Sequence, residues 1–169
     1  MESKPRRVER RPYYRASNRL LAERAVALPA LRVLRDDDLR ALAEVHLPAL
    51  RGTVDDEEDT LEQLVDDYRG GTTGDWGTPL RDRWLVTEDD RGIAAAVLTT
   101  HWRGTPFIAL VVTRLDAQRR GLASALIAEV AARSLARGEP ELALIVTRGN
   151  PALDLYERLG FVEADRPDA

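Results

Sequence analysis

The stretch FIALVVT, residues 107–113, followed after four residues by QRRGLAS, residues 118–124, decides the fold. The first is a continuous apolar run with the length of a buried strand. The second opens a periodic segment that we expect to be a helix from about Arg119 to Arg137, with Gly138 as its end signal. Residues 141–147 then read as another strand. A strand, a helix and a strand in this order indicate a right-handed parallel crossover.

The turn between this strand and helix has the composition of an anion-binding site. The first turn of a helix leaves backbone N–H groups without intrahelical acceptors, at the positive end of the helix dipole. Gly121, Ala123 and Ser124 are small enough for a diphosphate to approach the backbone, and Arg119 and Arg120 add positive charge. The alternative interpretation is a solvated basic helix start in which Gly121 has no special role.

Apolar periodicity predicts the remaining elements. Helices are expected over residues 18–27, 36–48 and 152–159, and a further helix follows the acidic residues 55–59 and runs through Tyr68. Strands are expected over residues 31–34, 83–87 and 93–100. The glycine-rich residues 70–79 around Trp76 are expected to form a flexible loop and a candidate lid. The result is an α+β fold with a mixed sheet.

Charge is distributed unevenly along the chain. The formal net charge is -4, but residues 1–27 carry eight basic and three acidic side chains, so they contribute +5 and the rest of the chain -9. We interpret residues 1–27 as a basic extension, an arm or a short helix, ahead of one domain over residues 28–169. The acidic domain argues against a general nucleic-acid binder and suits an amine-bearing substrate. Nucleic-acid binding through the extension is a competing, less favoured hypothesis.

The 169-residue chain has no cysteine, which excludes disulfides, thiolate metal sites and an acyl-cysteine intermediate. We expect no metal in the site. No apolar run approaches the ~20 residues of a membrane span, and the basic start lacks the apolar segment of a signal peptide. The expected location is the cytoplasm, without a membrane partner.

Two motifs together resemble those of the GNAT superfamily of acyl-CoA-dependent N-acetyltransferases. Residues 118–123 resemble its Q/R-x-x-G-x-G/A signature, and Val146 with Asn150, followed by ALDLYERLGF at 152–161, resembles V-x-x-x-N and A-x-x-L-Y-x-x-x-G-F. The match covers roughly residues 83–163. The resemblance implies a GNAT-like fold, in which helices flank a twisted, mixed and mostly antiparallel sheet that splays apart between strands 4 and 5.

The same resemblance implies roles for individual residues. Acetyl-CoA would be the cosubstrate, its pantetheine arm pairing with backbone along Val111, Val112 and Thr113. Its pyrophosphate would meet the backbone N–H groups of Gln118, Arg119, Arg120, Gly121, Leu122, Ala123 and Ser124. Asn150 would contact the arm, although the link from Asn150 to Tyr156 is one residue shorter than the family's usual spacing and contains Pro151.

Tyr156 would act as the general acid toward the departing thiolate. A phenol with a pKa near ~10 can donate a proton to a thiolate and stay neutral at pH 7. The alternative is an aromatic side chain that packs the helix and leaves its hydroxyl at the surface.

The predicted reaction transfers acetyl to a primary amine of a small molecule, peptide or protein by direct attack in a ternary complex. It needs a base because the amine must be neutral to attack, yet residues 107–112 contain no carboxylate or histidine. Glu88 and His101 are the first candidates, with Asp55 and Glu57 as further ones. The competing function is a non-catalytic acyl-CoA-binding regulatory module. Homodimers are common among similar proteins, so a second copy is a candidate partner.

Overall fold

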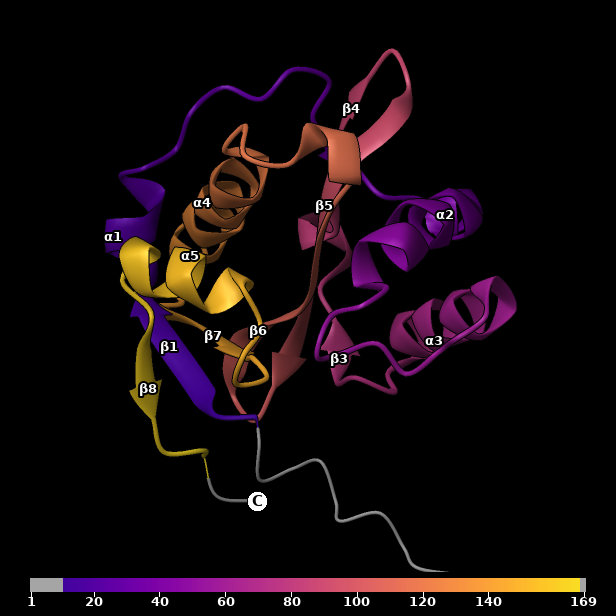
Figure 1. Ribbon diagram of the computed structural model, residues 1–169. Coiled ribbons are helices and arrows are strands. Elements are labelled where there is room, and N and C mark those ends of the chain that lie inside the picture. The colour runs from indigo at the N-terminus through magenta and orange to yellow at the C-terminus, as the bar shows by residue number, and fades with distance from the viewer. Residues whose placement is uncertain (1–10, 168–169) are drawn as a thin grey trace, which may run out of the picture.

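The computed structural model describes residues 11–167, and these form one eight-stranded sheet with helices on both faces (Figure 1). The strand order is β2-β4-β5-β6-β7-β1-β8, with β3 beside β5. The strands are β1 (Tyr13–Ser17), β2 (Arg32–Val33), β3 (Thr78–Pro79), β4 (Leu85–Asp89), β5 (Gly92–Trp102), β6 (Thr105–Thr113), β7 (Glu141–Ile145) and β8 (Val162–Ala164). The helices are α1 (Asn18–Ala22), α2 (Leu39–Leu50), α3 (Leu61–Thr73), α4 (Leu122–Leu135) and α5 (Ala152–Leu159).

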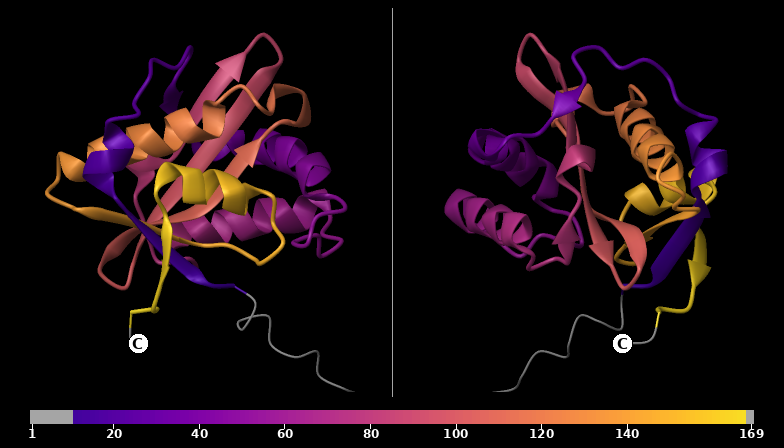
Figure 2. Two further views of the ribbon diagram at one scale, coloured as in Figure 1. Left: turned by 60° about the vertical axis from the view of Figure 1, so that its left-hand side comes forward. Right: turned by 180° about the vertical axis from the view of Figure 1, so that it is seen from behind.

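Two hydrophobic cores lie on opposite faces of the sheet. Helices α2 and α3 cover one face, and α1, α4 and α5 lie on the other, as Figure 2 shows from two further directions. Successive residues of a strand point to opposite faces. On β5, Val97 accordingly packs in the core under α4 and Leu98 in the core under α2 and α3. Both side chains are fully buried, which explains why β5 reads as a continuous apolar run.

The sheet opens between β6 and β7. Strands β4, β5 and β6 form an antiparallel meander, whereas β6 and β7 are parallel and joined through α4, as the crossover prediction required. Only Phe107 and Ile108 of β6 are in register with β7, opposite Ala143 and Leu144. Beyond Ile108 the two strands diverge. The predicted α+β fold with a splayed, mostly antiparallel sheet is therefore confirmed.

The basic extension contains a strand that the sequence analysis did not predict. β1 is antiparallel to β7 on one side and to β8 on the other, and its Tyr13, Tyr14 and Ala16 are buried. The helix expected over residues 18–27 ends at Ala22. This part of the extension is thus built into the sheet, not a free arm. Residues 1–10 lie outside the described residues, and the division of the chain at residue 27 stays a prediction.

The glycine-rich segment is not a flexible lid, which corrects the prediction. Helix α3 continues through Gly70 and Gly71 to Thr73, and Gly74 ends it in the left-handed conformation. A Cβ on Gly71 would lie 2.6 Å from the ring of Trp76, so glycine lets that ring pack against the helix. Trp76 also stacks on the buried Trp84, with ring centroids 6.2 Å apart. The segment is therefore fixed by core contacts.

Candidate functional site

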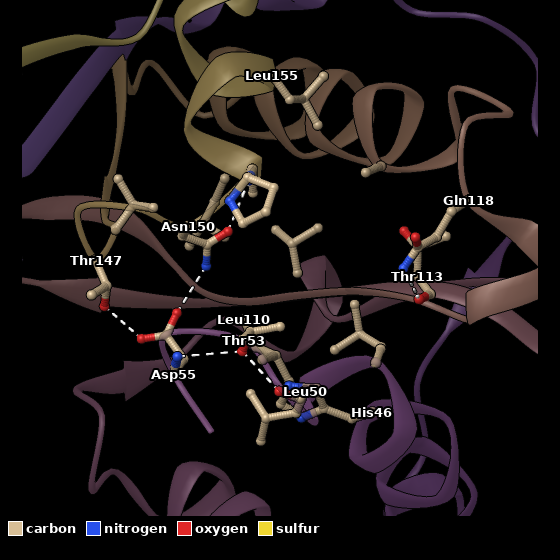
Figure 3. A pocket seen from close by; sticks show the side chains of 18 of the residues that line it. His46, Leu50, Thr53, Asp55, Leu110, Thr113, Gln118, Thr147, Asn150 and Leu155 are labelled. Carbon is tan, nitrogen blue, oxygen red and sulfur yellow. Dashed lines mark hydrogen bonds between the residues drawn. The ribbon is translucent and has the colours of Figure 1, made fainter. Parts of the chain in front are cut away.

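A cleft of about 1440 Å³ lies where β6 and β7 diverge. Its walls come from the C-terminal half of β6, the end of β7, the start of α4, helix α5 and the loop between α2 and α3. Figure 3 shows Thr113 and Gln118 at one end of this cleft and Asp55, Thr147 and Asn150 at the other. The two ends of the cleft differ in chemistry, with backbone donors at the first and a hydrogen-bonded carboxylate at the second.

The first end is built around the backbone before α4. The helix begins at Leu122, not at Arg119 as predicted, because Gly121 precedes it in the left-handed region with φ +75° and ψ 13°. Arg119 also has a positive φ of 63°, which is uncommon for a residue with a Cβ. These two positive φ angles turn the chain between η4 (Leu115–Ala117) and α4.

The turn exposes a row of backbone donors. Within the described residues, no backbone carbonyl accepts a hydrogen bond from the N–H groups of residues 118–124. A Cβ built on Gly121 meets no atom within 4 Å, so the space in front of this backbone is open. Unpaired N–H groups at a helix N-terminus with room in front of them fit a diphosphate. We call residues 118–124 the cradle.

Most of the predicted cofactor-binding residues line the cleft. These are Val111, Val112, Thr113, Gln118, Arg119, Gly121, Leu122, Ala123, Ser124 and Asn150. Arg120 does not, since its guanidinium turns back to donate to the carbonyl of Asp116 at 3.0 Å. On β6, residues 109–113 have β5 on one side and no strand on the other among the described residues. Their outer edge is therefore free to pair with an extended ligand.

Tyr156 lies on α5 with its side chain in the wall of the cleft. It is 8% exposed, and its hydroxyl makes no hydrogen bond within the described part of the chain. Burial, with a smaller contribution from the Asp55 carboxylate, raises the pKa of Tyr156 to about 12. The phenol is therefore neutral at pH 7 and able to donate.

The side chain of Asn150 links the start of α5 to the α2–α3 loop. Its side-chain oxygen accepts from the N–H of Ala152 at 2.8 Å, at the start of α5. Its side-chain nitrogen donates to Asp55 at 2.8 Å, and the Thr147 hydroxyl donates to the same carboxylate at 2.5 Å. The shortened link through Pro151 thus places Asn150 between the first turn of α5 and the α2–α3 loop.

The first two candidates for the base lie outside the cleft, which corrects that prediction. Glu88 is near the end of β4 and accepts a hydrogen bond from Arg32 at 2.6 Å. His101 is on β5, in register with Thr78 of β3. Neither lines the cleft, because β4 and β5 lie on the opposite side of β6 from the β6–β7 opening. The further candidates Asp55 and Glu57 do line it.

The sequence analysis missed His46 and Thr147, which also line the cleft. His46 is on α2 and is hydrogen-bonded through Nδ1 to the hydroxyl of Tyr68 on α3, at 2.5 Å. Burial lowers the pKa of His46 to about 4, so the imidazole is neutral at pH 7. No local pattern signals this pair, because the two residues lie 22 positions apart on neighbouring helices.

Comparison with known proteins agrees with this architecture. Residues 85–167 match the FR47-like protein family. A functionally unknown conserved protein from Staphylococcus epidermidis has a similar structure at 16% identity and a TM-score of 0.68, over 91% of this chain and 57% of that one. A GCN5-related N-acetyltransferase from Sphaerobacter thermophilus is similar at 22% identity and a TM-score of 0.62, over 91% of this chain and 48% of that one. The chain thus spans about half the length of these two proteins.

A third similar structure is the PaiA N-acetyltransferase from Thermoplasma acidophilum in complex with coenzyme A. It shares 17% identity at a TM-score of 0.64, over 84% of this chain and 94% of that one. No curated protein matches the sequence. At these identities the comparisons establish that the chain shares its fold with solved N-acetyltransferase structures.

Within residues 11–167, no helix combines the length and the apolar character needed to cross a membrane.

Proposed function

We propose that the protein is an acetyl-CoA-dependent N-acetyltransferase that acts on a primary amine by direct attack in a ternary complex. The observation that carries this proposal is that the cradle and Tyr156 line one cleft at the β6–β7 opening. The similar structure from Thermoplasma acidophilum contains coenzyme A, which supports an acyl-CoA cosubstrate here.

The residues present fit such a cosubstrate. The N–H groups of the cradle would hold the pyrophosphate, aided by the charge of Arg119 and the positive end of the α4 dipole. The free edge of β6 at Val111 and Thr113 would pair with the pantetheine arm, leading the thioester toward Tyr156. Gly121 has no side chain to obstruct the phosphates.

Tyr156 would protonate the thiolate as the C–S bond breaks. Its pKa of about 12 keeps the phenol protonated at pH 7, so the hydroxyl is available to donate to the thiolate that develops as the bond breaks. Direct attack is favoured over a covalent relay because the chain has no cysteine to carry the acetyl group.

The competing proposal is a regulatory module that binds acyl-CoA without turnover. It requires the cradle but not Tyr156. Tyr156 lines the same cleft as the cradle, and its hydroxyl has no partner within the described residues, so it is available to a bound thioester. That placement favours the enzyme.

The test measures coenzyme A binding by calorimetry and thiol release from acetyl-CoA across a panel of primary amines. We expect Tyr156→Phe to lower kcat by about 100-fold or more and to leave coenzyme A affinity within about twofold. Tyr14→Phe is the matched control, because Tyr14 is equally buried but lies on β1 outside the cleft. Tight binding without thiol release would support the regulatory module, and absence of coenzyme A binding would refute both.

A further inference from the structure

Asp55 holds an unusual position at the far end of the cleft from the cradle. It belongs to the α2–α3 loop, yet its carboxylate is bound by residues that follow β7. Thr147 donates to Oδ1 at 2.5 Å, Asn150 donates to Oδ2 at 2.8 Å, and Arg11 approaches Oδ1 at 3.4 Å. These contacts fix the carboxylate against the wall formed by β7 and α5.

The carboxylate keeps room for another donor. Two carboxylate oxygens accept about four hydrogen bonds, and within residues 11–167 Oδ2 receives only that of Asn150. The side chain is 22% exposed and lines the cleft, which leaves the carboxylate open to a ligand bound there.

Asp55 and Tyr156 line the same cleft. The charge of Asp55 contributes to the raised pKa of Tyr156, so the two groups lie within electrostatic range of one another. The Tyr156 side chain is more than nine-tenths buried, and its hydroxyl has no partner within the described residues. A donor placed between them would therefore contact a fixed carboxylate on one side and the reacting centre on the other.

Acidic side chains of the α2–α3 loop and α3 line this cleft, together with Arg11, Arg51 and Arg158. Glu57, Asp59 and Asp67 line the same cleft, all from the α2–α3 loop or α3. Arg51 also lines it, but its guanidinium is engaged by the Asp56 carboxylate at 2.8 Å and by the carbonyl of Asp59. Negative charge in a partly enclosed cleft stabilises a bound ammonium.

From this geometry we propose that Asp55 binds the acceptor as a protonated alkylamine and takes its proton. This inference rests on the proposed acetyltransferase function and specifies its acceptor class. An alkylammonium would donate to Oδ2 of Asp55 and lose one proton to it, which later passes to solvent. The neutral nitrogen forms the C–N bond as the C–S bond breaks. Its second lost proton restores the one that Tyr156 gives to the thiolate, so the reaction yields an amide, a thiol and one proton.

A purely structural role for Asp55 predicts a different outcome. If the carboxylate only ties the α2–α3 loop to Thr147 and Asn150, its loss weakens the fold and affects all acceptors equally. If it binds an ammonium, its loss is specific to amines that are protonated at the assay pH. Arylamines are neutral at pH 7, whereas primary alkylamines are charged, so the two classes separate the alternatives.

The experiment compares Asp55→Asn with the parent on benzylamine and 4-methylaniline, using thiol release. We expect kcat/KM for benzylamine to fall about 100-fold at pH 7 and that for 4-methylaniline to change less than about threefold, with the KM for acetyl-CoA unchanged. The benzylamine defect should shrink as pH rises, because free amine then forms in solution. The charged or titratable groups around Asp55 include Arg11, His46, Glu57, Asp59 and Tyr156, and the variant retains them all.

Two variants complete the design. Asp66→Asn removes an exposed carboxylate that is paired with Arg69 on α3 outside the cleft, and should leave both amines unaffected. Thr147→Val removes one bond to Asp55 but keeps the carboxylate, so it should lower the melting temperature without the alkylamine-specific loss.

Equal losses on both amines in Asp55→Asn, or none, would overturn the inference while leaving the acetyltransferase intact. Absence of coenzyme A binding by the parent would instead overturn the proposed function.

Discussion

Replacing Gly121 by alanine separates the backbone strain of the cradle from its ligand contacts. Gly121 has φ +75°, and the added Cβ would meet no atom within 4 Å. Steric crowding is therefore absent, and the cost is that of holding an L-residue in the left-handed region. That cost is about 1–2 kcal/mol.

The backbone strain added by Gly121→Ala lowers either the free energy of unfolding or the affinity for coenzyme A, and both can be measured. If the variant keeps the native turn when free, the full cost lowers the free energy of unfolding and the affinity for coenzyme A is unchanged. If the free turn relaxes, binding must restore it, and affinity falls by at most about 5–30-fold. In either case, we expect the two losses to sum to about 1–2 kcal/mol.

Gly138 provides a matched control at the other end of α4. It also has φ +75° and open space where a Cβ would lie, but it is remote from the cleft. Gly138→Ala should show a similar loss of stability in urea unfolding and no loss of coenzyme A affinity in calorimetry. The reasoning fails if both variants weaken coenzyme A binding equally, or if Gly121→Ala changes neither quantity.

Two further predictions concern stability. The pKa of His46 falls from 6.5 in the unfolded chain to about 4 in the folded protein. The free energy of unfolding should therefore decline by up to about 3 kcal/mol as the pH drops from 6.5 to 4, because the unfolded state binds the proton first. Urea unfolding of His46→Gln across this pH range should lack that part of the decline. Arg83, whose side chain is 3% exposed, donates to Glu139 at 2.5 Å, so Glu139→Gln should leave a buried guanidinium poorly paired and destabilise the protein by about 3 kcal/mol. A loss below about 1 kcal/mol in urea unfolding would contradict the second prediction.

The elements that local patterns define were predictable from the sequence. The helix at residues 152–159 has the predicted bounds, and the meander appeared as apolar runs separated by turns. β1 and β8 were missed because they are short and depend on pairing with distant segments. The start of α4 was misplaced because the left-handed geometry of Gly121 delays the helix by three residues.

The cofactor side of the candidate site was more predictable from the sequence than the acceptor side, where Asp55 and Glu57 were only further candidates behind Glu88 and His101. The cradle follows from one contiguous motif, so its residues are necessarily close together. The acceptor side is assembled from segments far apart in the chain, and Asp55 meets Asn150 across 95 positions. Glu88 and His101 were chosen because they lie near the ends of predicted strands. The position of a residue along its strand does not reveal on which side of β6 that strand lies in the sheet.

The placement of β1 between β7 and β8 constrains the order in which the protein can be built. During synthesis, residues 13–17 emerge early and must wait for residues 141–145 and 162–164 before they gain any strand neighbour. The β4–β5–β6 meander needs no such delay, since its partners are adjacent in sequence. We therefore expect a nascent chain to form the meander first, with Tyr13 and Tyr14 exposed until synthesis nears residue 164.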